Sequence, residues 1–469
     1  MDDLSFDSGS FRDRTSRVFY HDHTVYRGLD SQALRDWQAL QSTGFFSRFM
    51  KEGRLVQTEQ VNNVADLGDV VSRIFDAVLE HETIPFISYP YEWCFGMLKD
   101  AALLHLDLLL AALDEEMILK DSTPFNMQWR GSQCVFIDIP SIEIHQPGMP
   151  WSAYRQFCQM FLYPLLLQSY KHTSYHAWLR GSIDGIAPRE FANLVSFRDC
   201  FRPGVLTHGI LHAKAESRYA ATSNDIRKDL KSAGFGRELI KANVRGLRRI
   251  INRLTWKQPK SQWVDYAENN TYTEQDLGDK ADFVRAVVAE RKRPVVWDLG
   301  CNTGLFSRIA ADGGSYVVSL DSDHATIEKL YQDLKSEGKT SILPLVGNVA
   351  DLSPNLGWRG CERKGLVERG TPDLLICLAL IHHMVLTANI PMREFIAWLA
   401  SLQSDLIIEF ITKDDPMVKA LLRNKLDNYD DYEMGRFEQA MSEFFTVEHR
   451  RELRSGTRTL YFAKPKPMA

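Results

Sequence analysis

The 469-residue chain has little of what marks secreted, metal-binding or membrane proteins. Its seven cysteines are scattered, with no CxxC pair and no histidine at metal-ligand spacing, so we expect reduced thiols and no metal site. The N-terminal stretch MDDLSFDSGSFRDRTSR is acidic and polar, which predicts neither a signal peptide nor a transit peptide. The apolar run from Ala101 to Leu113, interrupted by His105 and Asp107, is too short to cross a bilayer and predicts a buried helix. We therefore expect a cytoplasmic protein without membrane segments.

The charge balance narrows the possible partners. A net charge of −5 disfavours a protein built to coat nucleic acid or an anionic membrane. One segment, Ile226 to Lys260, is rich in arginine and lysine and has apolar residues at helical spacing, which predicts an amphipathic helix with a basic face. Both a solvated connecting helix and an anion-binding surface fit this pattern, so a structured RNA stays an open alternative. No pattern indicates an oligomeric state.

The C-terminal part of the chain alternates apolar, β-rich runs with amphipathic segments, which predicts a parallel sheet covered by helices on both faces. From about residue 291 the expected strands are RPVVWDLG, SYVVSLD, SILPLVGN, PDLLICLAL and SDLIIEF. The last segment, FFTVEHRRELRSGTRTLYFAKP, predicts two antiparallel strands joined at Ser455-Gly456. The expected fold class is α/β, with a seven-stranded Rossmann-like sheet of five parallel strands and a terminal hairpin.

The turn after the first of these strands, DLGCNTG, indicates the cofactor. It lacks the GxGxxG spacing with which dinucleotide sites hold pyrophosphate. Asp298, just before Gly300, would repel pyrophosphate but would suit the ammonium group of S-adenosylmethionine. Asn302 stands where such a turn usually has a glycine, and asparagine tolerates a positive φ. The turn then ends at Gly304, where the helix begins. S-adenosylmethionine is therefore the expected cofactor.

The ends of the next strands supply further candidates. Asp321, at the end of the second strand, can accept hydrogen bonds from both ribose hydroxyls, and Asp323 competes for that role. Asn348 follows the third strand, where a side-chain amide can read the adenine edge. His382 and His383 follow the fourth strand, beside the crevice where open α/β sheets bind ligands. One of them is a candidate general base, although a buried structural histidine is the alternative.

Two more features near the sheet have two interpretations each. Glu409, at the end of the fifth strand, is either a catalytic acid or base, or a structural acid paired with a cation such as Arg363. The segment before the sheet, SQWVDYAENNTYTEQD, either closes over the cofactor or packs as an ordinary linker; its aromatic residues are Trp263, Tyr266 and Tyr272. Lys280 reaches the cofactor carboxylate only if this segment folds back.

The motifs DLGCNTG, VVSLDSD, GNVAD and LALIHHM resemble those of class I S-adenosylmethionine-dependent methyltransferases over residues 291 to 469. More narrowly, the chain resembles the bacterial branch of nodulation-protein NoeA-like methyltransferases, through YPYEW, LKDAALL, FIDIPS, YRQFC and IIEF among others. Residue by residue, the resemblance implies a methionine subsite at Asp298, Gly300, Asn302 and Gly304. It implies a ribose contact at Asp321 and an adenine contact at Asn348.

A second signal lies in the N-terminal half, in LKDSTPFNMQWRGSQCVFID. Asp121 is followed by Asn126 after five residues and by Asp138 after an expected hairpin, as in the catalytic loop of kinases, which this region faintly resembles. However, the first 60 residues contain no glycine-rich phosphate loop and no VAIK-like lysine, and Lys120 stands where the motif has arginine. A degenerate kinase-like lobe used for substrate binding and an unrelated hairpin both remain open.

We expect three regions: a mixed α+β accessory domain at residues 1–225, a basic helix and linker at 226–290, and a cofactor-binding domain at 291–469. The predicted function is methyl transfer to an O, N or C nucleophile on a bulky small-molecule or glycan-type acceptor. A bifunctional or kinase-derived protein and a catalytically silent cofactor-binding scaffold are the alternatives.

Overall fold

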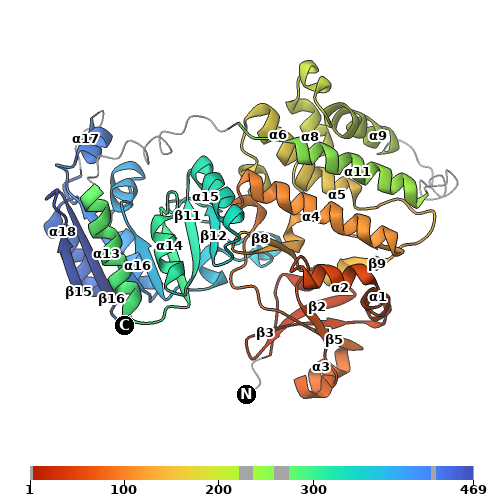
Figure 1. Ribbon diagram of the computed structural model, residues 1–469, viewed down its shortest axis with the longest axis horizontal. Coiled ribbons are helices and arrows are strands. Elements are labelled where there is room, and N and C mark those ends of the chain that lie inside the picture. Colours follow the sequence, from red (N-terminus) through yellow and green to blue (C-terminus); the bar gives the residue numbers. More distant parts are fainter. Residues whose placement is uncertain (1–3, 221–235, 258–273, 424–428, 468–469) are drawn as a thin grey trace. The chain divides into compact units, whose positions relative to one another are not determined.

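The computed structural model describes residues 4–220, 236–257, 274–423 and 429–467 (Figure 1). The chain divides into two compact units, each of which includes a short segment from the sequence of the other. Unit 1 comprises the described residues of Met1–Trp129, Cys134–Lys257 and Gly357–Arg363. Unit 2 comprises those of Arg130–Gln133, Gln258–Leu356 and Lys364–Ala469.

Unit 2 is built on one mixed sheet. The strand order is β12-β11-β10-β13-β14-β16-β15, and the first five of these strands are parallel while β16 runs antiparallel to both of its neighbours. The strands lie where the sequence predicted them, at Val295–Leu299 (β10), Tyr316–Asp321 (β11), Ile342–Val346 (β12), Leu374–Cys377 (β13), Asp405–Ile411 (β14), Phe445–Glu452 (β15) and Arg458–Pro465 (β16). The five parallel strands are almost entirely buried, which explains their continuous apolar runs.

The helices of unit 2 connect these strands. They are α13 (Glu274–Glu290), α14 (Leu305–Asp312), α15 (His324–Glu337), α16 (Met392–Ser401), α17 (Pro416–Leu422) and α18 (Met434–Phe444). The chain order runs outward from β10 to β12 on one side and from β13 to β14 on the other. Right-handed crossovers therefore place α14 and α15 on the face opposite to α16. In agreement, α14 packs against α13, and α16 packs against α18.

Unit 1 begins with an antiparallel sheet in the order β1-β2-β3-β5-β4. Its strands are β1 (Ser5–Phe6), β2 (Ser16–His21), β3 (Thr24–Leu29), β4 (Thr58–Gln60) and β5 (Ala77–His81). Phe19 and Val78 from this sheet form a core cluster with Leu67 and Val71. The remaining strands pair as β6 (Met117–Leu119) with β9 (Ile142–Ile144) and β7 (Met127–Arg130) with β8 (Gln133–Phe136).

Helices make up the rest of unit 1. They are α1 (Ser31–Gln41), α2 (Gly44–Lys51), α3 (Asp69–Ile74), α4 (Phe95–Asp114), α5 (Tyr154–Phe157), α6 (Tyr163–Lys171), α7 (His176–Gly181), α8 (Pro188–Leu194), α9 (Leu211–Ala220) and α11 (Arg237–Arg253). The predicted buried helix is α4, which packs against the basic helix α11. Acids of α4 pair with two cations of α11: Asp107 with Arg248 at 2.6 Å and Asp114 with Lys241 at 2.6 Å. Part of the basic face is thus neutralised within unit 1.

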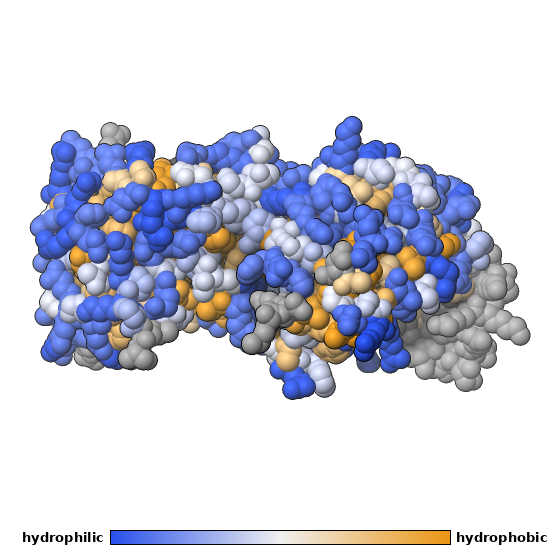
Figure 2. Space-filling view, turned by 90° about the horizontal axis from the view of Figure 1, so that it is seen from below, coloured by the Kyte–Doolittle hydropathy of each residue, from blue (hydrophilic) through white to orange (hydrophobic). Residues whose placement is uncertain are grey.

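Among the described residues, no helix is both long and apolar enough to span a membrane. Much of the face in Figure 2 is hydrophilic, with hydrophobic residues in separate groups. All seven cysteines are free thiols.

Candidate functional site

The glycine turn between β10 and α14 has the conformation that its sequence predicted. Gly300, Asn302 and Gly304 all have positive φ angles, of 76°, 48° and 82°. Asn302 therefore adopts the left-handed conformation expected of it, and its Oδ1 accepts a hydrogen bond from the Thr303 N–H at 2.6 Å. A Cβ atom on Gly304 would lie 2.7 Å from Leu330 Cδ1, so another residue here would be strained by the positive φ and would displace the end of the Leu330 side chain.

Asp298 lies behind this turn and is only 2% exposed. Its Oδ2 accepts a 2.6 Å hydrogen bond from Ser307 Oγ, which in turn accepts one from Ser319 Oγ at 2.8 Å. Burial raises the pKa of Asp298 to about 7, with a further contribution from Asp321, although the Ser307 hydrogen bond acts in the opposite direction. A nearby cationic group would favour the ionised form.

Asp321 and Asp323 have separate roles at the end of β11. Asp321 accepts backbone N–H groups with both carboxylate oxygens, from Asn302 at 2.9 Å and from Asp323 at 2.9 Å. Burial raises its pKa above the usual value. Asp323 is the N-cap of α15, where its Oδ1 accepts the N–H groups of Ala325 and Thr326. Asp323 thus uses Oδ1 to cap a helix, whereas Asp321 uses both oxygens to hold the neighbouring loops.

Backbone hydrogen bonds tie the strand-end loops to one another. The N–H groups of Gly300 and Cys301 both donate to Leu320 O, and that of Gly347 donates to Asp321 O. Asn348 thus follows β12 beside the Asp321 loop. Its exposed side chain accepts a hydrogen bond from Ala350 N–H at 3.0 Å, which leaves the amide N–H₂ group as the donor for a ligand.

The two histidines follow β13 next to the glycine turn, since a Cβ on Gly300 would be 3.4 Å from Leu380. The rings of His382 and His383 lie 4.1 Å apart. His382 is 1% exposed, and burial together with His383, Arg458 and Lys280 lowers its pKa well below 6.5. Burial also lowers the pKa of His383, to about 4, and this ring is only partly covered. Both rings are therefore neutral at pH 7.

Glu409 lies at the centre of an ion-pair network in unit 2. It is 0% exposed, and its Oε1 lies 2.7 Å from Lys280 Nζ and 3.4 Å from Arg458 Nη1. Arg458 also pairs with Asp415 at 2.7 Å. The cations beside Glu409 are therefore Lys280 and Arg458, whereas Arg363, which the sequence suggested, lies beside Glu362. Residues 129 and 49 positions away in sequence supply the cations instead.

The network also holds the start of the histidine-bearing turn. Glu409 Oε2 accepts a hydrogen bond from the Ala379 N–H at 2.9 Å. Ala379, the second residue after β13, has a φ of 50°, an unfavourable value for alanine. Lys280, which the sequence offered as a contact for the cofactor carboxylate, is 2% exposed and bound to Glu409. The aromatic candidates Trp263, Tyr266 and Tyr272 lie outside the described residues.

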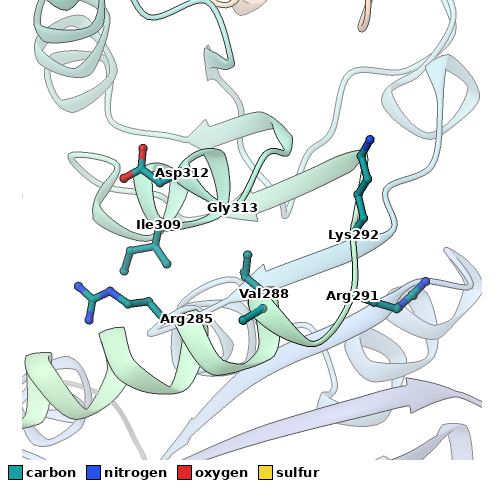
Figure 3. A pocket seen from close by; sticks show the side chains of 8 residues that line it. Arg285, Val288, Arg291, Lys292, Ile309, Asp312 and Gly313 are labelled. Carbon is teal, nitrogen blue, oxygen red and sulfur yellow. The ribbon is translucent and has the colours of Figure 1, made fainter.

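A pocket of 480 Å³ lies between α13 and α14, away from these loops (Figure 3). Arg291 and Lys292 in its lining precede β10, so it lies toward the opposite end of the strand from the glycine turn. Its arginines have partners: Arg285 pairs with Asp282 at 2.8 Å and Arg291 with Asp405 at 2.9 Å. In the described part of the chain, no group of three or more His, Cys, Asp or Glu residues is arranged to hold a metal.

The strand order, with one antiparallel strand inserted beside β14, and the glycine turn next to a buried acid together define the fold expected from the sequence, that of a class I methyltransferase. Nodulation protein NoeA of Rhizobium meliloti (strain 1021) is 34% identical over 456 residues, which cover 97% of this chain and 95% of that protein. The chain therefore belongs to the NoeA family. No model of a protein family matches it.

Solved structures of two methyltransferases are similar at low identity. Magnesium protoporphyrin IX methyltransferase (ChlM) from Synechocystis PCC 6803 with bound SAH is 17% identical, with a TM-score of 0.31, over 44% of this chain and 95% of that one. The N-methyltransferase NodS from Bradyrhizobium japonicum WM9 is 12% identical, with a TM-score of 0.30, over 41% of this chain and 98% of that one. At these scores neither likeness adds to the argument.

Proposed function

We propose that unit 2 transfers a methyl group from S-adenosylmethionine to an O, N or C nucleophile. The observation that carries this proposal is a pair of acids beside the glycine turn: Asp298 is buried and bonded to Ser307 of α14, and Asp321 is partly buried and bonded to the Asn302 N–H of the turn. Asp298 faces the ammonium group of the cofactor, and Asp321 accepts hydrogen bonds from the ribose hydroxyls. Asn348 binds the adenine edge, while Gly300, Asn302 and Gly304 surround the methionine part.

Transfer of a methyl group from a sulfonium is a direct displacement in which a neutral thioether leaves. The protein must chiefly align the nucleophile with the methyl carbon and exclude water. A base is required only when the nucleophile still carries a proton. We assign this role to His383, because its ring is neutral and partly exposed, whereas the ring of His382 is buried. His382 then packs behind His383 and keeps it in place.

We assign Glu409 a positioning role in place of the catalytic one considered from the sequence. The Glu409 carboxylate is fully buried and is bound by Lys280, Arg458 and the Ala379 N–H. A substrate proton therefore cannot reach it. Its hydrogen bond to Ala379 supports the left-handed residue from which the histidine-bearing turn starts. Loss of Glu409 would then act on His383 through the backbone.

The methyl acceptor is proposed to be a bulky small molecule or a glycan-type compound in the cytoplasm. We propose that residues 1–225 help to select it and that residues 291–469 bind the cofactor. Of the expected connecting segment 226–290, helix α11 belongs to unit 1 and helix α13 to unit 2. The two alternatives make different demands: a silent scaffold would bind the cofactor without turnover, and a kinase-derived protein would bind nucleotide through Asp121, Asn126 and Asp138.

Calorimetric titration of the full chain with S-adenosylmethionine and S-adenosylhomocysteine tests the proposal. Both ligands should bind, and Asp298→Ala should abolish binding of both. A matched control is Asp312→Ala, which removes an exposed acid at the end of α14, remote from the turn. If both ligands fail to bind, unit 2 does not use this cofactor. Transfer of labelled methyl from S-adenosylmethionine into fractions of a bacterial extract then separates an active enzyme from a scaffold.

A further inference from the structure

The turn after β6 in unit 1 brings two acids and an amide together. Asp121 and Asn126 lie in this turn, and Asp138 follows β8 at the end of the next hairpin. The backbone connects the two segments, because Ile137 N–H donates to Asn126 O at 2.9 Å. Burial raises the pKa of Asp121, and the nearby charge of Asp138 raises it further. The motif singled out in the sequence is therefore assembled in space.

A cation from a third element joins this group. Arg27 on β3 places its Nη1 2.8 Å from Asp138 Oδ1, and both side chains are largely buried. Two donors at this place lack an acceptor among the described residues: Arg27 Nε and the Nδ2 of Asn126, whose side chain is 9% exposed. Buried donors without acceptors are rare and costly, which indicates an acceptor-rich ligand.

A second arginine lies at the same turn. The guanidinium carbon of Arg363 is 3.8 Å from the ring centroid of Phe125, the neighbour of Asn126 in sequence, and Arg363 Nε also has no acceptor in the described part of the chain. The preceding Glu362 is held in unit 1 by Arg12, with hydrogen bonds of 2.6 and 3.0 Å. The turn thus carries donors and cations as well as acids.

We infer that Arg27, Asp121, Asn126 and Asp138 bind a polyphosphate ligand together with a divalent cation. Two carboxylates alone hold Mg²⁺ poorly, but Mg²⁺ is commonly bound by one or two carboxylates plus phosphate oxygens of a ligand. The divalent cation replaces Arg27 as the partner of Asp138, and the guanidinium of Arg27 then donates hydrogen bonds to the phosphate oxygens. Each charge of the present ion pair thereby gains a new partner of opposite sign. The inference concerns binding only and is independent of the methyl-transfer reaction.

The test is calorimetric titration of the full chain with three probes: ATP with Mg²⁺, inorganic pyrophosphate with Mg²⁺, and Mg²⁺ alone. Excess S-adenosylhomocysteine is present throughout, so that ATP cannot bind through its adenosine part in unit 2. We expect binding of ATP and pyrophosphate only with Mg²⁺, and at least tenfold weaker binding in Asp138→Asn and in Asn126→Ala. Glu59→Gln, an exposed acid on β4 of the same unit, is the matched control and should bind as the unchanged chain does.

The outcomes separate clearly. Binding of ATP but not of pyrophosphate supports the inference and adds a nucleoside contact to the site. The inference is overturned if neither ATP nor pyrophosphate binds at millimolar concentration with Mg²⁺. It is also overturned if they bind and Asp138→Asn and Asn126→Ala leave that binding unchanged. ATP that binds only when S-adenosylhomocysteine is omitted also overturns it, because that ATP occupies unit 2. Thermal unfolding of each variant shows that it is folded, and two different substitutions keep the test valid if one fails to fold.

Discussion

Asp298→Asn is the perturbation that examines the proposed cofactor site most directly. The substitution keeps the shape of the side chain and an oxygen to accept the Ser307 hydrogen bond, but removes the charge. Burial raises the pKa of Asp298 to about 7 in the folded chain. Below that pH, and without a ligand, this residue is therefore largely protonated. A bound ammonium group would favour the carboxylate, so ligand binding should release a proton.

The same shift has a consequence for stability. From the ordinary value of 3.8 to about 7, the folded chain holds a proton that the unfolded chain has lost, so stability falls as pH rises through this window. At about 1.4 kcal/mol for each unit of pKa difference, the free energy of unfolding is lower by about 4 kcal/mol above pH 7. Asn does not titrate, so the variant without ligand should unfold at a higher temperature than the unchanged chain at pH 8, and with little difference at pH 4.

Titration calorimetry with S-adenosylhomocysteine, in buffers of different ionisation enthalpy, counts the protons released. At pH 6 the unchanged chain should release close to one proton per ligand, and its affinity should rise with pH up to about 7. Asp298→Asn should bind more weakly, release no proton and show no such pH dependence. If the unchanged chain and the variant release equal numbers of protons, Asp298 does not face the ammonium group.

The remaining predictions concern the other residues of unit 2. Asp321→Ala should weaken S-adenosylhomocysteine binding by about 1.5 to 3 kcal/mol in calorimetry. Asp323→Ala should leave this affinity unchanged but should lower the free energy of unfolding by about 1 kcal/mol in denaturant, because an N-cap is lost. The reverse result would move the ribose contact to Asp323. Lys280→Met should lower the free energy of unfolding by about 3 to 5 kcal/mol, because it leaves buried Glu409 short of a cation. The double variant Lys280→Met with Glu409→Leu should recover part of this loss. If the losses of the two single variants simply add in the double variant, the two side chains do not pair. In NMR titration the His383 ring should gain its proton near pH 4, and a midpoint near 6.5 would contradict its burial.

Features that depend on local sequence were predictable. Apolar runs in the sequence indicate the strands of unit 2. The glycine turn requires residues that tolerate a positive φ, and Gly300, Asn302 and Gly304 are such residues. The distinction between Asp321 and Asp323 also had a local signal, since Asp323 stands immediately before a helical pattern, where an N-cap belongs. That signal was available in the sequence and identifies Asp323 as a helix cap.

Features that depend on pairing across the fold were not predictable from one sequence. Ser307 donates to Asp298, and Ser319 donates to Ser307, only because α14 and β11 pack beside β10. Lys280 reaches Glu409 from a helix 129 positions earlier in the chain. Arg363 and Arg458 lie at similar distances from Glu409 along the chain, but only Arg458 is an ion-pair partner of Glu409 in the described chain. No spacing rule encodes such partners.

Asp298, Asp321 and Glu409 lie near the carboxyl ends of parallel strands in unit 2, and they differ in what balances their charge. Glu409 is bound by Lys280 and Arg458. Asp298 and Asp321 accept hydrogen bonds from hydroxyl and backbone groups, and neither forms an ion pair with a lysine or arginine of the described chain. A pyrophosphate ligand would add negative charge beside two such groups, whereas S-adenosylmethionine brings an ammonium and a sulfonium. The unbalanced pair therefore favours the cationic cofactor, and the balanced acid fits a positioning role.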